Sequence, residues 1–335
     1  MKLITVVSLL FVFAPPTFAQ STPQPPAVPA PPSTLAAAQF CPDDTLYFAN
    51  WNFGMANKLC VTEGASPKLL SSFYGVYGAQ KIFPLGPDSF YAVGFGKAYK
   101  LTADPNYGTQ YESWRVPGGG FVFNPNPNPW EQSLSFHFPS EYDGLKVYFN
   151  WQGRTWNEPL PFEDRFRCAS VVQASSGYEF CLSPAEGHIF QPLPKTPFDR
   201  PYSDGKVLLA GRQPVNMVAQ GDSVYVTLGT RYDCPTTPSV GPVNCAVIPG
   251  KLIALRPQGA GVVEEVLVEG IDVLNDAYQN RLAISSQGLY FITTMRQGNA
   301  GVPVIGFYSF RTRGTSLIIA GNEGDFFSAL TVVPN

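Results

Sequence analysis

The segment Asp222-Ser-Val-Tyr-Val-Thr-Leu228 carries the pattern that decides the fold. A turn residue precedes a short run of β-branched and aromatic residues centred on a tyrosine, which is typical of the second strand of a tight hairpin. The pattern recurs as Asp44–Trp51, Asp88–Gly94, Asp143–Trp151, Ser176–Cys181 and Gln287–Thr293. Six tyrosine strands at a spacing of about 50 residues predict an array of similar sheets, within the range of propeller blades.

Short apolar runs flank these tyrosine strands and are predicted to pair with them. The runs that precede a turn, expected to be the inner strands, are Lys81–Phe83, Leu134–Phe138, Cys168–Val172, Val215–Val218 and Leu282–Ser285. The runs that follow, expected to be third strands, are Lys58–Val61, Tyr99–Thr102, His188–Gln191, Lys251–Leu255 and Phe307–Phe310. In the third copy, the nearest candidate for a third strand is Trp156–Leu160.

The two ends of the pattern complement each other. The first unit begins directly at its tyrosine strand, and Phe327–Val333 looks like an inner strand that no tyrosine strand follows. Pairing Phe327–Val333 with Leu46–Trp51 would complete one blade from both termini and protect its edges. The sequence therefore predicts an all-β protein, a six-bladed β-propeller closed by its terminal strands. The alternative is a β-sandwich with similar hairpins.

With these repeats, Cys41–Asn335 resembles the broad six-bladed β-propeller group. The patterns that carry the resemblance include Gly288-Leu-Tyr-Phe291 and Asp222-Ser-Val-Tyr225. That group includes YWTD-type repeats, NHL-type repeats and calcium-dependent lactonase-like hydrolases. No Leu-Tyr-Trp-Thr-Asp segment and no repeated Trp-Asp pair occurs in the chain.

The N-terminal region predicts export. A basic start is followed by an apolar run over residues 3–13 and by small residues that end at Ala19, as in a cleaved secretory signal. That run is too short for a membrane span. Residues 20–40 contain the proline-rich stretch Ser21–Thr34, which favours extended polyproline geometry. We therefore expect a signal peptide over 1–19, a linker over 20–40 and a propeller domain over 41–335.

Six cysteines in an exported chain suggest three disulfides. Fifteen connectivities are possible, and the nearest-neighbour one is favoured because each couple brackets one hairpin or loop. It joins Cys41 to Cys60, Cys168 to Cys181 and Cys234 to Cys245. No Cys-x-x-Cys occurs, which argues against a zinc site.

Composition excludes several functions. The formal charge is −3 and only 14% of residues are charged, so the chain offers no field that attracts nucleic acid or an anionic membrane. Two histidines are too few for a histidine-rich metal centre. No Gly-x-Ser-x-Gly occurs, so no serine nucleophile is indicated.

Acidic residues precede several predicted inner strands. In a propeller these positions share one rim of the central tunnel, where carboxylate and amide oxygens from separate blades suit calcium. The candidate ligands are Glu131, Asp164, Asp276 and Asp325. Arg165 and Arg281 would partly neutralise this rim instead. The lactonase-like propellers hold an ion in such a place, and the resemblance implies no more than that.

Aromatic residues provide a second candidate site. Trp130 and Trp156 lie in proline-rich surroundings predicted to be loops, and His137 lies on a predicted inner strand where it could face the channel. We expect Trp51 and Trp151, which end predicted strands, to pack between blades. These features suggest a surface for a protein or carbohydrate ligand.

Two functional hypotheses follow. The first is an exported, disulfide-stapled propeller that binds a protein or glycan without catalysis. The alternative is a calcium-dependent lactonase or hydrolase that works at the acidic tunnel mouth. Low charge density and the lack of a base–nucleophile pair favour the first.

Overall fold

The computed structural model has β-strands as its regular secondary structure in the residues that it describes. It describes residues 41–86, 89–94, 97–104, 108–115, 122–123, 134–138, 145–149, 155–159, 170–183, 188–191, 206–210, 212–234, 245–259, 261–274, 279–297 and 300–333. Within these ranges, no helix is long and apolar enough to cross a membrane.

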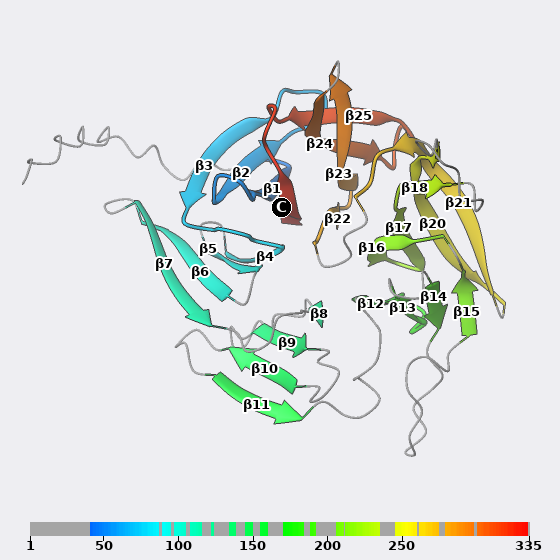
Figure 1. Cartoon of the computed structure of the whole chain (residues 1–335), viewed down its shortest axis with the longest axis horizontal. Coiled ribbons are helices and arrows are strands. Elements are labelled where there is room, and N and C mark those ends of the chain that lie inside the picture. The colour runs from blue at the N-terminus through cyan, green and yellow to red at the C-terminus, as the bar shows by residue number, and fades with distance from the viewer. Residues whose placement is uncertain are drawn as a thin grey trace, which may run out of the picture. The chain divides into compact units, whose positions relative to one another are not determined.

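The described strands form six four-stranded antiparallel sheets (Figure 1). The first contains β26 (Phe327–Val333), β1 (Asp44–Asn50), β2 (Met55–Val61) and β3 (Lys68–Tyr74). The second contains β4 (Lys81–Gly86), β5 (Ser89–Gly94), β6 (Lys97–Asp104) and β7 (Gly108–Arg115). The third contains β8 (Val122–Phe123), β9 (Leu134–Phe138), β10 (Leu145–Phe149) and β11 (Thr155–Pro159).

The remaining sheets follow in chain order. The fourth contains β12 (Ser170–Gln173), β13 (Glu179–Ser183), β14 (His188–Gln191) and β15 (Lys206–Leu209). The fifth contains β16 (Pro214–Gln220), β17 (Ser223–Leu228), β20 (Gly250–Gln258) and β21 (Gly261–Ile271). The sixth contains β22 (Leu282–Ile284), β23 (Gly288–Gln297), β24 (Ala300–Ser309) and β25 (Thr315–Ala320). A two-stranded hairpin, β18 (Arg231–Asp233) and β19 (Ala246–Ile248), is inserted between β17 and β20.

Every tyrosine-centred segment contributes a strand, although in the fourth copy Tyr178 itself lies just before the strand, which covers Glu179–Ser183. These segments become β1, β5, β10, β13, β17 and β23, and each pairs with the strand expected before or after it. The third sheet departs from the prediction in one respect. Leu134–Phe138 is not the first strand, because Val122–Phe123 pairs with His137 and Phe136 on its other side. The predicted inner-strand position of His137 is therefore wrong.

The C-terminal strand completes the first sheet. β26 pairs antiparallel with β1, from Thr45 opposite Val333 to Asn50 opposite Phe327, with one irregularity between Ala49 and Asn50. This confirms the predicted pairing of the two terminal segments. Phe48 and Phe327 also meet edge to face, with ring centroids 4.9 Å apart.

Neighbouring sheets pack through shared apolar cores. Phe48 and Leu59 of the first sheet contact Tyr290 and Phe307 of the sixth in one cluster. Similar clusters join the first sheet to the second, the fourth to the fifth, and the fifth to the sixth. Among the leading strands of the sheets, β26 contacts β4 and β22, while β16 contacts β12 and β22. Four-stranded sheets that pack face to face around their leading strands are typical of a β-propeller.

Two predicted disulfides are present. Cys41 is bonded to Cys60, which ties the segment before β1 to β2, and Cys234 is bonded to Cys245 beside the β18–β19 hairpin. Cys181 is also disulfide-bonded, and its predicted partner Cys168 lies outside the described residues.

The antiparallel strands place their connections at two ends of the sheets. We call one the Trp51 end, which carries residues 51–54, 75–80, 229–234, 245–249, 272–274, 279–281 and 321–326. We call the other the Glu63 end, which carries residues 62–67, 174–178, 221–222, 285–287 and 310–314. Contacts across the sheets support this division. The Trp51 amide donates to the Phe326 carbonyl (2.8 Å), and the Phe310 amide donates to the Gln287 carbonyl (3.0 Å).

Candidate binding face

Exposed apolar side chains gather at the Trp51 end. Eight large hydrophobic residues are exposed there, on connections or strand ends from three sheets: Phe53, Tyr74, Tyr77, Tyr232, Val247, Ile248, Leu274 and Met295. The other exposed large hydrophobics lie on outer strands: Leu69, Val207, Val263, Val266 and Leu317. Among the described residues, none lies in a connection of the Glu63 end. This asymmetry singles out the Trp51 end as the candidate face, because exposed apolar groups that cluster mark interaction sites.

Gly54 joins the turn that carries Phe53 to the loop that carries Tyr77. Gly54 has φ +57°, and a β-carbon on it would lie 2.5 Å from the Tyr77 ring, so only glycine leaves room for that ring. The Gly54 carbonyl accepts hydrogen bonds from the amides of Gly75 (3.0 Å) and Val76 (2.9 Å). The turn that carries Phe53 and the loop that carries Tyr77 are therefore one fixed unit.

Polar contacts anchor the same turn to the connection before β26. Asn50 Nδ2 donates to Asp325 Oδ1 at 2.9 Å, and Asn50 Oδ1 accepts from the Phe326 amide at 3.2 Å. The Trp51 ring meets the Phe326 ring edge to face, with centroids 6.0 Å apart. Trp51 thus packs against the connection before β26 of its own sheet, and its packing between blades stays a prediction. Its counterpart Trp151 lies outside the described residues. Loops held in this way need little ordering when they bind a ligand.

A furrow of about 380 Å³ opens beside these contacts, between the first sheet and β25. Its walls are mainly apolar, with Phe48, Phe53, Met55, Leu59, Leu69, Ile319 and Phe327 among the lining residues. Asn50, Asn57, Asn322 and Asp325 supply its polar groups. Several of these polar atoms are already bonded, since Asn57 Oδ1 accepts from Ser72 Oγ at 2.8 Å and Asn50 is occupied as described above.

Asp325 is the one predicted calcium ligand that lies within the described part of the chain. Its Oδ1 accepts from Asn50, and its Oδ2 accepts from the Asn322 amide at 2.6 Å, so both oxygens already hold the connection before β26. Glu131, Asp164 and Asp276 lie outside the described residues, as does Arg165. No group of three or more metal-ligating side chains occurs in the ranges that the structure describes.

The segment before β22 contacts the segment before β26. Arg281 is buried, its Nε donates to Gln279 Oε1 at 2.8 Å, and its guanidinium lies 5.0 Å from the centroid of the Phe326 ring. Arg281 therefore packs against the residue that follows Asp325.

The predicted aromatic site is only partly placed. Trp130 lies outside the described residues, and the backbone of His137 lies in β9 opposite Lys146. The predicted loop position of Trp156 is wrong, because this residue lies in β11 opposite Tyr148. The strand β11 pairs with β10, which agrees with Trp156–Leu160 as the candidate for a third strand. The chain continues a sheet there because Trp and Thr favour strands.

Sequence reasoning missed Phe53, Tyr77 and Tyr232. A usable signal was present, because Asn52-Phe53-Gly54 and Tyr77-Gly78 place an aromatic residue inside a turn where no strand can bury it. Tyr232 and Ile248 extend the face on the β18–β19 hairpin, which the Cys234–Cys245 bond closes.

Comparisons with known proteins concern the architecture. The chain is similar to a solved structure of a protein of unknown function from Bacteroides caccae, with a TM-score of 0.50 and 11% identity over 87% of this chain and 99% of that one. The likeness is one of fold. TolB from Acinetobacter baumannii gives a TM-score of 0.49 and 12% identity, over 88% of this chain and 67% of that one. The periplasmic gluconolactonase PpgL from Pseudomonas aeruginosa gives 0.42 and 12%, over 84% and 83%. No family model and no curated protein matches the chain.

Proposed function

We propose that this chain is an exported, non-catalytic binding module whose Trp51 end docks a protein partner. The observation that carries the proposal is the gathering of exposed apolar side chains at that end and on no described connection of the other. Interfaces are enriched in aromatic anchors, and Phe53, Tyr77 and Tyr232 have that character.

The chemistry of the furrow favours a protein over a glycan. A sugar needs free hydrogen-bonding groups, whereas the side chains of Asn50 and Asp325 are hydrogen-bonded to one another and to backbone amides. What stays open to a ligand is mainly apolar wall, with Phe53 57% exposed at its mouth. An apolar side chain of a partner, inserted beside Phe53, fits this lining.

The wider setting of the proposal is an extracytoplasmic propeller. Disulfides persist in oxidising compartments, which supports an extracytoplasmic location and is consistent with a signal peptide over residues 1–19. We further propose six blades closed by β26 against β1, with the region after the signal acting as a tether up to residue 40. The β26–β1 register and the shared cores support closure.

Removing the two aromatic side chains of the fixed turn should abolish docking. Peptides selected from a random phage-displayed library against the purified protein should bind Phe53→Ala/Tyr77→Ala at least about thirtyfold more weakly, because truncating central aromatic anchors costs about 2 kcal/mol or more. Titration of the same peptides by fluorescence anisotropy measures the change.

Val207→Ala is the matched control, because Val207 is 49% exposed but lies on β15, away from the Trp51 end. It should bind the selected peptides as the wild type does. Equal binding to both variants would place the site elsewhere. Ligands found only on a glycan array would replace the protein partner by a carbohydrate.

The calcium site and the hydrolase alternative stay hypotheses, and a melting experiment tests them. A cation held only by the folded state raises the melting temperature when calcium is added, and EDTA lowers it. Asp325→Ala is a poor test, since it also removes the bonds to Asn50 and Asn322. Asp164→Ala and Asp276→Ala should lose the calcium response. A melting curve indifferent to calcium and EDTA, in a metal-free protein, counts against the site.

A further inference from the structure

The outer strand β25 differs from the outer strands of the other sheets. Each outer strand pairs on one side only among the described strands, and no described strand occupies its other edge, where a further strand could pair. The outer strands other than β25 each carry a charged residue: Lys68 in β3, Glu112 and Arg115 in β7, Glu158 in β11, Lys206 in β15, and Glu264, Glu265 and Glu269 in β21. β25, with the sequence Thr-Ser-Leu-Ile-Ile-Ala, carries none, and it has no proline.

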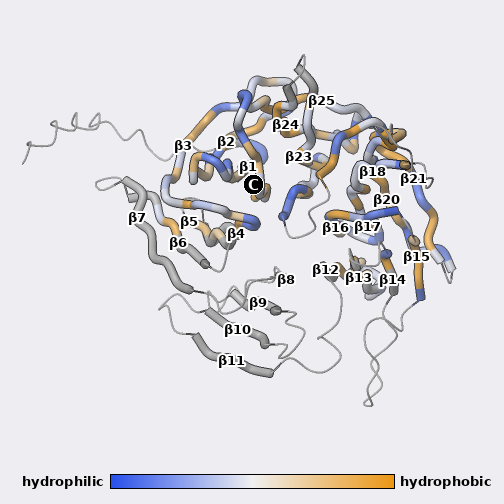
Figure 2. Tube along the Cα trace, viewed as in Figure 1, coloured by the Kyte–Doolittle hydropathy of each residue, from blue (hydrophilic) through white to orange (hydrophobic). Residues whose placement is uncertain are grey.

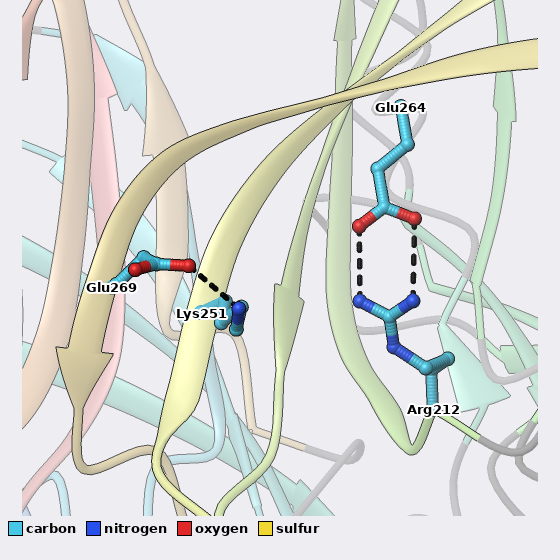
Figure 3. A network of polar contacts seen from close by, with 4 residues as sticks. All are labelled: Arg212, Lys251, Glu264 and Glu269. Atoms are coloured by element: carbon cyan, nitrogen blue, oxygen red, sulfur yellow. Dashed lines mark hydrogen bonds and ion pairs between the residues drawn. The ribbon is translucent and has the colours of Figure 1, made fainter.

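The contrast with β21 is the sharpest. Acidic side chains of β21 are fixed by cations along the strand, with Arg212 bound through both its terminal nitrogens to Glu264 (2.9 and 3.4 Å) and Lys251 bound to Glu269 (2.6 Å) (Figure 3). Charges of this kind discourage pairing with another chain. The two strands also differ in hydropathy, because polar residues interrupt β21 (Figure 2).

Where β21 carries acidic side chains, β25 carries apolar and hydroxyl side chains. Leu317 is 54% exposed, and Thr315 and Ser316 are also exposed. A bulge at Ile318 interrupts its pairing with β24, but β3, β15 and β21 have similar bulges, so the bulge does not distinguish this edge.

Charges at the two ends of β25 have opposite sign. Arg311 and Arg313 precede the strand, and Glu323 and Asp325 follow it. Two copies of β25 placed antiparallel about a two-fold axis near Leu317 and Ile318 bring the basic end of one beside the acidic end of the other. The side chain of Arg313 is 76% exposed and lies 3.9 Å from Glu265, which leaves it able to reach a second partner.

We propose that β25 pairs with β25 of a second copy of this chain, forming a two-fold dimer with a continuous sheet across the interface. The two-fold arrangement makes every contact twice, including Arg313 with Glu323 of the partner subunit. Backbone hydrogen bonds provide the pairing, and burial of Leu317 and the end charges provide the selectivity for this edge.

Sedimentation velocity over about a hundredfold range of concentration tests the dimer, because mass action converts monomer to dimer as concentration rises. Leu317→Lys should give a monomer throughout the range. Val263→Lys, at a residue 47% exposed on the charged edge of β21, should dimerise as the wild type does. A wild type that stays monomeric, or a dimer that survives Leu317→Lys, overturns the proposal.

Charge exchange tests the orientation without touching the strand. Arg313→Glu and Glu323→Arg should each weaken the dimer by about tenfold, because each creates two like-charge contacts. The double variant should regain the wild-type dissociation constant. A double variant as weak as the single ones, or single variants without effect, contradicts the antiparallel two-fold pairing.

Discussion

Asn216→Ala should lower the free energy of unfolding by about 2–4 kcal/mol, although it removes only one small amide. Asn216 is buried, and its Nδ2 donates to the Gln279 carbonyl at 2.6 Å. Its Oδ1 accepts from the Arg281 amide at 3.2 Å. The alanine leaves a backbone acceptor and a backbone donor buried without these partners, and each costs about 1–3 kcal/mol. Urea unfolding followed by tryptophan fluorescence measures the loss.

The effect is large because residues 279–281 connect several sheets. Asn280 donates through Nδ2 to the Leu330 carbonyl (3.0 Å), and its amide donates to the Gln80 carbonyl (2.9 Å). One three-residue segment thus contacts β16, β26 and the residue before β4 at the Trp51 end. Asn216 sets the position of that segment from the β16 side.

Asn322→Ala is the matched control, because Asn322 is an exposed asparagine on a connection of the same face. A surface substitution of this kind should change the unfolding free energy by no more than about 0.5 kcal/mol. If Asn216→Ala is equally mild, the 279–281 segment is not held by this side chain, and the sheets keep their places by apolar packing alone.

Local patterns explain how much of the fold could be predicted. Asp222–Leu228 announces β17 because a turn residue and a run of β-formers lie within a few residues of each other. The pairing of β26 with β1 could be predicted because no tyrosine strand follows β26 and no inner strand precedes β1. β8 could not be predicted, since two residues give no periodicity, and its pairing displaced His137 from the first position in its sheet.

The site was harder because its contacts are remote in sequence. Asp325 was assigned to calcium from its place before an inner strand, yet Asn50, 275 residues away, occupies one of its oxygens. Asn216 and Gln279 are 63 residues apart, and no sequence pattern in either segment predicts the hydrogen bond between them. A carboxylate in a loop gives the same sequence signal whether it binds a metal or caps a turn.

Tyr290→Phe should lower the unfolding free energy by about 2 kcal/mol at neutral pH and alter the response to alkali. The buried Tyr290 hydroxyl donates to Asp44 Oδ2 at 2.8 Å and joins β23 to β1 across 246 residues. Phenylalanine keeps the ring in its apolar cluster but leaves a buried carboxylate without this donor. Burial, and then the charge of Asp44, raise the pKa of Tyr290 well above its ordinary value.

The sign of the alkaline effect follows from this raised pKa. Below a pH of about 10 both the folded and the unfolded chain hold the phenolic proton, so the contribution of Tyr290 is fully present. Above that pH the unfolded chain loses the proton and the folded one keeps it, and stability falls by about 1.4 kcal/mol per pH unit from this group. Tyr290→Phe should remove that part of the slope in denaturant titrations between neutral and alkaline pH.

Tyr178→Phe is the control, because the Tyr178 hydroxyl is buried and makes no hydrogen bond among the described residues. Its loss should therefore leave the free energy of unfolding unchanged or raise it. Equal stabilities for Tyr290→Phe and wild type, with parallel alkaline slopes, would show that the Tyr290–Asp44 bond does not join the first and sixth sheets in solution.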